Sequence, residues 1–130
     1  MAKYKNVFII DDDPLAIFIA KRLMDALEFA EVITTFTTCA GALEYLQKNL
    51  TNSHAAAMPQ IILLDINMPV LNGWDFMERF GMLAFDDAVM PSLHICSATV
   101  EKDDVEKALR YPFVKNFLLK PLSRDHLRIL

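Results

Sequence analysis

The chain has 130 residues, of which 54% are hydrophobic and 23% are charged, and its formal net charge is −4 at pH 7. A single hydrophobic core usually spans about 100–150 residues, so this length and composition predict one globular domain over residues 1–130. A weakly acidic chain without an apolar run near the ~18 residues of a membrane span is expected to make no direct contact with nucleic acid or membrane.

Short apolar runs alternate along the chain with stretches of helical spacing. The runs are rich in branched side chains, which favours strands. They lie at Val7–Ile10, Glu31–Phe36, Ile61–Leu64, Leu93–Cys96 and Asn116–Leu119. The first helix is predicted to begin at Pro14, with Asp13 as its N-cap. Its buried stripe is predicted from residues spaced four apart: Leu15, Ile19, Leu23 and Leu27.

Four further helices are predicted from caps and apolar spacing. They are expected around Leu43–Leu50, from the cap Asn72 to about Phe80, over Glu101–Leu109, and after the cap Ser123. In the helix over Glu101–Leu109, Val105 and Leu109 should face the core, because most residues around them are charged. The polar and alanine-rich stretch 51–59, which includes His54, is predicted to be a loop.

Five strand–helix units predict an α/β domain. Each right-handed crossover places a helix on one side of a parallel sheet, so helices should cover both faces. In such sheets ligands bind beyond the carboxyl ends of the strands. The residues that follow each predicted strand are therefore the candidates for function.

Polar side chains follow four of the predicted strands: Asp11, Asp12 and Asp13; Asp65; Ser97 and Thr99; and Lys120. Carboxylates held close together repel one another, so this arrangement favours a bound cation. Oxygen ligands with room for water suit magnesium, and a carboxylate can itself attack a phosphoryl group. Placement alone thus predicts magnesium-dependent phosphoryl chemistry on an aspartate.

Four short motifs occur in order along the chain: IIDDDP at 9–14, LLDINMPVLNG at 63–73, CSAT at 96–99 and FLLKP at 117–121. Together they resemble the receiver domain of response regulators in two-component signalling, in particular the single-domain chemotaxis regulators. The resemblance implies a flavodoxin-like, doubly wound (βα)5 fold with a five-stranded parallel sheet in the order 2-1-3-4-5. It also implies that the chain accepts a phosphoryl group from a histidine kinase or a histidine phosphotransfer protein.

The motifs assign roles to individual residues of this chain. By this resemblance Asp65 corresponds to the phosphoacceptor and Lys120 to the lysine that binds the phosphoryl group. Asp11 and Asp12 correspond to the acidic pair, with Asp12 a direct magnesium ligand and Asp11 acting largely through water. Asn67 corresponds to the residue whose backbone carbonyl completes the metal shell. The implied magnesium site therefore consists of Asp11, Asp12, Asp65 and Asn67.

The resemblance also implies a switch. Ser97 corresponds to the hydroxyl that moves toward the phosphoryl group, and Phe117 to the aromatic residue that rotates with it, where the family often has tyrosine. Asn67 and Thr99 lie at positions that tune the rate of dephosphorylation. Catalysis is expected only as autophosphorylation and autodephosphorylation, so the chain is not predicted to be an enzyme for other substrates.

The implied output is a surface formed by the fourth predicted helix, the fifth predicted strand and the fifth predicted helix. A downstream protein, or a second copy of the chain as a homodimer, is expected to dock there after phosphorylation. The Lys120-Pro121 peptide is expected to be cis, as is common at this place in receivers.

The two cysteines of the chain indicate the redox compartment. Cys39 and Cys96 lie among apolar residues and lack CxxC spacing, which predicts buried, reduced thiols. Reduced thiols are typical of a cytoplasmic protein.

Two alternatives to a free-standing, phosphorylated receiver stay open at this stage. The chain can be the receiver of a longer hybrid kinase or DNA-binding regulator, because its last predicted helix is short. It can also be a scaffold that keeps the fold and acts without phosphorylation. The acidic residues, Ser97 and Lys120 argue against the scaffold.

Overall fold

The computed structural model describes residues 2–51, 57–86 and 89–130. Its five strands pair in parallel in the order β2-β1-β3-β4-β5. They are β1 (Tyr4–Ile10), β2 (Ala30–Phe36), β3 (Ile61–Asp65), β4 (Ser92–Ser97) and β5 (Val114–Leu119). The predicted flavodoxin-like (βα)5 fold and its strand order are confirmed.

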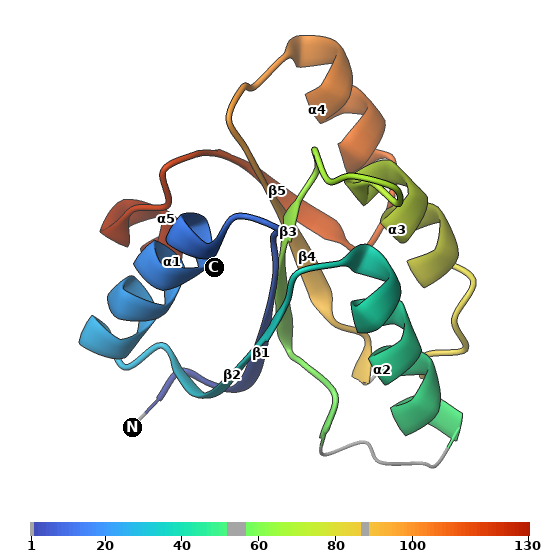
Figure 1. Ribbon diagram of the computed structural model, residues 1–130, viewed down its shortest axis with the longest axis horizontal. Helices are drawn as coiled ribbons and strands as arrows, with labels where there is room; N and C mark the ends of the chain where they lie inside the picture. Colours follow the sequence, from blue (N-terminus) through green and yellow to red (C-terminus); the bar gives the residue numbers. More distant parts are fainter. Residues whose placement is uncertain (1, 52–56, 87–88) are drawn as a thin grey trace.

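Five helices cover the two faces of the sheet: α1 (Pro14–Ala26), α2 (Cys39–Thr51), α3 (Gly73–Phe80), α4 (Lys102–Leu109) and α5 (Arg124–Ile129). Figure 1 shows α1 and α5 on one side of the sheet and α2 and α3 on the other, with α4 at the top of the view above α3. Within the described residues, none of the helices combines the length and the apolar character needed to cross a bilayer. Thr51, expected in a loop, is the last residue of α2, and the rest of the predicted loop at 52–56, with His54, lies outside the described residues.

The central strands of the sheet are buried on both faces, because alternate side chains point to opposite sides and helices cover each side. In β1, Phe8 and Ile10 join the cluster covered by α2, α3 and α4, whereas Val7 and Ile9 join the cluster covered by α1 and α5. In β3 the whole run Ile61–Leu64 is buried. A strand covered on both faces has a continuous apolar sequence, which explains why these runs show no polar alternation.

The predicted buried stripe of α1 is wrong at its first residue. Leu15 is 63% exposed, and the residues that α1 buries are Ala20 and Met24. Each residue turns a helix by about 100°, so a row of residues spaced four apart moves about 40° around the helix at every step. Over the row Leu15–Leu27 this drift carries the first side chain off the buried face. The predicted N-cap is confirmed, since the Leu15 N–H donates to Asp13 Oδ1 at 3.0 Å.

The predicted inward face of α4 is partly wrong as well. Leu109 is 50% exposed, Val105 is half-buried, and the residue that α4 buries is Ala108. Neighbouring residues of a helix point about 100° apart, so the close approach of Ala108 to the fold turns Leu109 toward solvent. A helix that buries one small side chain gains little stabilisation from the core.

His94 is a buried imidazole in β4, with 3% of its surface exposed. Asn116 Nδ2 on β5 lies 3.0 Å from His94 Nδ1, and His94 Nε2 has no hydrogen-bond partner among the described residues. Burial, with a smaller contribution from the charge of Lys115, lowers the pKa of His94 from 6.5 to about 4. The folded chain therefore keeps this imidazole neutral at pH values where the unfolded chain protonates it.

We expect the free energy of unfolding to fall as the pH drops from about 6.5 to about 4, because the unfolded chain then binds a proton at His94 that the folded chain does not. The loss assigned to His94 should be about 3 kcal/mol, since each pKa unit corresponds to about 1.4 kcal/mol. Urea unfolding followed by circular dichroism at a series of pH values measures it. In His94→Gln, which keeps a hydrogen-bonding side chain but does not titrate, the fall should be smaller by this amount. If the free energy of unfolding fell equally in both proteins, its pH dependence would come from groups other than His94.

Candidate functional site

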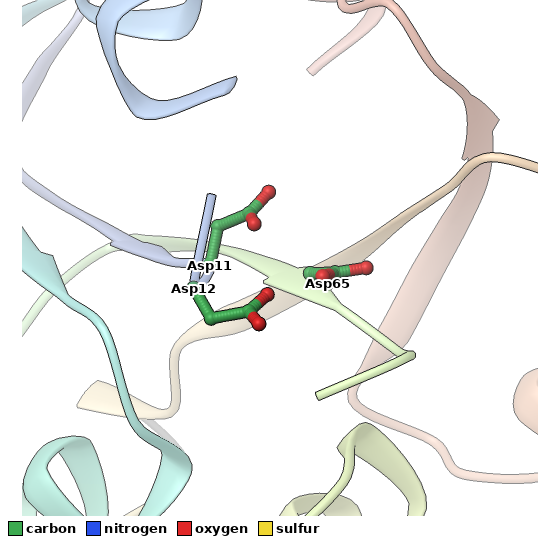
Figure 2. A group of neighbouring side chains, drawn as sticks. All are labelled: Asp11, Asp12 and Asp65. Carbon is green, nitrogen blue, oxygen red and sulfur yellow. The ribbon is translucent and has the colours of Figure 1, made fainter. Parts of the chain in front are cut away.

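Three carboxylates meet where β1 and β3 end. Asp11 and Asp12 directly follow β1, and Asp65 is the last residue of β3, which pairs with β1 through Ile10 and Leu64. The three side chains each offer a carboxylate oxygen, and these oxygens lie within 4.8 Å of one another. Figure 2 shows the carboxylates of Asp11 and Asp12 beside that of Asp65, at the ends of the two strands. The structure therefore brings together the acidic residues that the sequence predicted to be neighbours.

Lys120 adds a cation to this cluster from the end of β5. Its Nζ donates to Asp11 Oδ2 at 2.7 Å and lies 3.5 Å from Asp65 Oδ1. Its backbone N–H donates to the carbonyl oxygen of Ser97 at 2.8 Å, which ties the end of β5 to the end of β4. The Lys120-Pro121 peptide is cis, as predicted.

Burial and neighbouring charge raise the pKa of the Asp65 carboxyl group above its ordinary value. Burial is the largest cause and the charge of Asp11 the next, while Lys120 and the backbone N–H of Asn67 only partly oppose them. For Lys120, burial alone would lower the pKa of the ammonium, but the hydrogen bond and charge of Asp11 and the charge of Asp65 raise it. Because the ammonium is closer to Asp11 than to Asp65, it leaves much of the repulsion on Asp65 uncompensated.

The three carboxylates fit a divalent cation. Their oxygens are hard ligands gathered in one place, and Asp12 is exposed, so one side of the cluster is open to water. Magnesium prefers such oxygen ligands and keeps several waters. A cation would also offset the repulsion that a single ammonium does not balance. The cluster of Asp11, Asp12 and Asp65 is thus the candidate metal site.

The four other residues predicted to act at this site, Ser97, Thr99, Asn67 and Phe117, differ in burial. Ser97 ends β4 and is buried, and its Oγ accepts a hydrogen bond from the Thr99 N–H at 3.4 Å. The Asn67 N–H donates to Asp65 Oδ1 at 3.3 Å, while the residue itself is exposed. Phe117 lies in β5 and is half-buried against the hydrophobic cluster that α2, α3 and α4 cover. Their roles remain predictions at this point.

Asp13, the third aspartate of the run, does not belong to the cluster. It caps α1, and its own N–H donates to Asp11 Oδ1 at 2.9 Å. This hydrogen bond holds the Asp11 carboxylate beside the start of the helix. The cap role predicted for Asp13 is confirmed. Asp13 affects the acidic cluster through its hydrogen bond to Asp11.

A pocket of about 280 Å³ continues from the cluster along α1 toward the turn between β5 and α5. Its polar end is formed by Asp11, Asp65 and Lys120, and its walls include the apolar side chains Leu15 and Ile19. Sequence reasoning missed this role, because it assigned both apolar residues to the core. The available signal was their position in the first turns of the helix directly after the acidic run.

Gly73 ends the motif LLDINMPVLNG and has a packing role that sequence reasoning missed. Its N–H donates to the Ile66 carbonyl oxygen at 2.9 Å, and a Cβ placed on it would lie 2.7 Å from Ile66 Cα. Real Cβ atoms do not approach a backbone so closely, so glycine is required for this contact. The first residue of α3 is thereby packed against the backbone that follows Asp65.

The chain matches the family model described as the response regulator receiver domain over residues 7–130. It therefore belongs to the response regulator receiver family of two-component signalling. The predicted family is confirmed by this match.

Curated relatives and solved structures agree with this assignment. The transcriptional regulatory protein CitT of Halalkalibacterium halodurans is 32% identical over 96% of the chain and 50% of its own length. MalR of Bacillus subtilis is 30% identical over 91% of the chain and 45% of its own length. The chain thus spans about half the length of these two relatives.

Two solved structures have nearly the same extent as the chain. A two-component response regulator from Cytophaga hutchinsonii superposes with a TM-score of 0.84 at 26% identity, covering 98% of this chain and 93% of that one. A response regulator receiver protein from Dyadobacter fermentans gives a TM-score of 0.79 at 31% identity, covering 96% and 93%. The arrangement of strands and helices described above is therefore that of receivers.

Replacing Asp65 by asparagine should stabilise the fold at neutral pH. Since the folded state raises the pKa of Asp65, its charged form costs stability above the ordinary pKa, and an uncharged side chain of equal size removes this cost. We expect the free energy of unfolding at pH 7 without divalent metal to rise by about 1 kcal/mol.

Chemical denaturation of the wild type, Asp65→Asn and a control, Asp13→Asn, measures this difference. Asp13 is exposed, and asparagine caps a helix as well as aspartate does, so the control should keep the stability of the wild type. A less stable Asp65→Asn would mean that the carboxylate is held by net attraction instead of repulsion.

Proposed function

We propose that the chain accepts a phosphoryl group on Asp65 from a histidine kinase or a histidine phosphotransfer protein and that this changes a protein-binding surface. The observation that carries the proposal is the placement of Asp65. Its carboxylate is buried at a strand end, beside Asp11 and within 3.5 Å of the Lys120 ammonium. An anionic nucleophile next to a fixed cation is what attack on a charged phosphoryl group requires.

In the proposed reaction an Asp65 oxygen attacks the phosphorus of a phosphohistidine in line with its phosphorus–nitrogen bond. The new phosphorus–oxygen bond forms as the phosphorus–nitrogen bond breaks, and the imidazole leaves with the electron pair. Lys120 neutralises charge on the phosphoryl oxygens during transfer. Its raised pKa supports this role, because the ammonium then stays charged throughout the physiological pH range.

Asp12, Asp65 and the backbone carbonyl of Asn67 are the proposed magnesium ligands, with Asp11 acting largely through water. When bound, the ion supplies positive charge that neutralises the oxygens of the transferred group. The donor set supports the assignment, since its carboxylate oxygens lie together and one of them is exposed. Asp11 would then interact both with water bound to the ion and with Lys120, whose hydrogen bond it accepts.

The apolar side of the pocket supports a protein as the phosphoryl donor. Leu15 is largely exposed and lines the same pocket as Asp65. A protein that brings a phosphohistidine to Asp65 can bury this side chain, which a small phosphodonor does not need. Exposed apolar side chains beside a polar site are typical of protein-binding surfaces.

The proposed switch consists of Ser97 and Phe117. The buried Ser97 hydroxyl moves toward a phosphoryl oxygen, and Phe117, which has no hydroxyl to hold it outside, rotates into the space below α4. The α4-β5-α5 face is the proposed output surface, for a downstream protein or for a second copy of the chain as a homodimer. Leu109 and Leu119, both half-exposed, give this face apolar surface to bury on docking.

Asn67 and Thr99 are proposed to tune the lifetime of the phosphoryl group. Both are exposed and donate a backbone N–H to a reacting or switching residue, Asp65 and Ser97. Their side chains can thus limit the access of water. The proposed chemistry is confined to autophosphorylation and autodephosphorylation, with no other substrate.

The proposed setting is the cytoplasm, without direct nucleic-acid or membrane contact. The net charge of −4 gives little attraction to either polyanionic surface. Cys39 and Cys96 are both free and buried, as predicted, and burial raises the pKa of each thiol to about 12, which keeps them unreactive.

Beryllofluoride with magnesium, a stand-in for the phosphoryl group, should shift amide signals of the wild type both around Asp65 and across residues 101–119. Ser97→Ala should still be phosphorylated by acetyl phosphate, seen by intact mass, but should lose most of the distant shifts. Asp65→Asn should lose both responses, because it lacks the nucleophile.

A matched control is Ser92→Ala, at the opposite end of β4 from Ser97. It should behave as the wild type in both measurements. If the shifts in the wild type stayed within the Asp65 pocket, the proposed switch would be wrong. That result would favour a scaffold that acts without phosphorylation.

A further inference from the structure

α4 is held to the fold by few contacts of its own. Its one buried side chain is the small Ala108, and its N-cap residue, Glu101, makes no side-chain hydrogen bond to the first turn. Figure 1 shows α4 at the top of the molecule, above α3. Such a helix changes position at low free-energy cost, so the contacts that reach it from neighbouring elements decide where it lies.

Two side-chain pairs join α3 to α4 and to the turn that follows α4. The Lys107 ammonium lies 4.1 Å from the centre of the Trp74 ring. The Tyr111 hydroxyl donates to Glu78 Oε2 at 2.8 Å, which raises the pKa of the Tyr111 phenol. Trp74 and Glu78 are four residues apart, and so are Lys107 and Tyr111. In α3 this spacing places Trp74 and Glu78 on one side of the helix. They contact the last turn of α4 at Lys107 and the turn that follows α4 at Tyr111, so the two pairs are neighbours.

The start of α3 is tied to the backbone beside Asp65. Gly73 donates to the Ile66 carbonyl oxygen and approaches Ile66 more closely than any residue with a Cβ permits. Trp74 is the next residue, and the Asn72–Asp75 capping box fixes this end of the helix. A displacement of the backbone at Ile66 therefore moves α3 together with the Trp74 ring.

We infer that α3 couples Asp65 to α4: the Trp74–Lys107 and Glu78–Tyr111 pairs hold α4 while Asp65 has a free carboxylate, and loading of Asp65 loosens them. This inference rests on the function proposed for Asp65. The Asn67 N–H donates to the free Asp65 carboxylate, and an oxygen taken up by a phosphoryl group changes that bond. The backbone from Asp65 to Asn67 then shifts, and the tight contact at Gly73 passes the shift to α3.

The route is separate from the one through Ser97 and Phe117. That route leaves the site from β4 and β5, whereas this one leaves from the loop after β3 and reaches α4 from the side of α3. A cation over an aromatic ring and an exposed hydrogen bond each change a population by about two- to fivefold. Two such pairs are enough to bias a helix as weakly anchored as α4.

Because loading of Asp65 and loosening of the pairs are thermodynamically linked, the inference can be tested by measuring the ligand affinity of Asp65. If loading of Asp65 loosens the two pairs, a variant that lacks them has no such contacts to lose on loading. Its affinity for the group that loads Asp65 should therefore exceed that of the wild type by the same factor. Lys107→Met removes the charge but keeps the length of the side chain, and Tyr111→Phe removes the hydroxyl but keeps the ring that packs on Phe113. The affinity for beryllofluoride at saturating magnesium, followed by amide shifts of Asp65 and its neighbours, should rise two- to fivefold in each variant.

Two further variants separate coupling from a general effect of charge on α4. Lys102→Met is the matched control, because the Lys102 side chain is exposed and its ion pair with Glu106 lies within α4. It should leave the affinity unchanged. Lys107→Arg keeps a cation for the Trp74 ring and should restore the affinity of the wild type. Equal affinities in all variants, or weaker binding in Lys107→Met and Tyr111→Phe, would overturn the inference.

Hydrogen exchange tests the hold on α4 without any ligand. In the free protein, amides of α4 should exchange two- to fivefold faster in Lys107→Met and Tyr111→Phe than in the wild type or Lys102→Met. Unchanged exchange would show that the pairs do not hold the helix, and the inference would fail. A wild type that never binds beryllofluoride would instead overturn the function proposed for Asp65, and the exchange result would still decide whether α3 holds α4.

Discussion

Lys120 places one ammonium group among three carboxylates, 2.7 Å from Asp11 Oδ2 and 3.5 Å from Asp65 Oδ1, and this single charge does not balance them. Burial, together with this imbalance, raises the pKa of Asp65 and costs stability that the doubly covered sheet must supply. It also defines the chemistry, because a divalent cation and then a phosphoryl group each change the charge on the same few oxygens. A site under such repulsion responds strongly when one of these groups arrives.

The fold converts that local change into a movement because its parts are anchored unequally. β1 and β3 are buried on both faces and hold Asp11 and Asp65 at fixed positions. α4 buries one small residue and depends on side chains from α3 and on the residues around β5. The proposed routes through Ser97 and through Gly73 therefore end at the element whose position is easiest to change.

The strand order was predicted from the resemblance of the motifs to receivers. The meeting of Asp11, Asp12, Asp65 and Lys120 was predicted because the carboxyl ends of parallel strands share one edge. The sequence did not predict which side of a helix is buried, as Leu15 shows, because a stripe of residues spaced four apart drifts around the helix. The pairs between α3 and α4 were also missed. They join residues more than 30 positions apart, from α3 to the end of α4 and the turn that follows it. A lysine beside a tryptophan and a tyrosine beside a glutamate leave no periodic pattern in the sequence that would mark the contact.

The most direct test of the central claim is magnesium binding measured by titration calorimetry. We expect millimolar affinity in the wild type, at least tenfold weaker binding in Asp12→Asn, and no change in Asp13→Asn, whose side chain caps α1 outside the cluster. Saturating magnesium should also remove the stability difference between the wild type and Asp65→Asn, since the ion relieves the repulsion that the substitution removes. A wild type that binds no magnesium, or an Asp12→Asn that binds it equally well, would contradict the account.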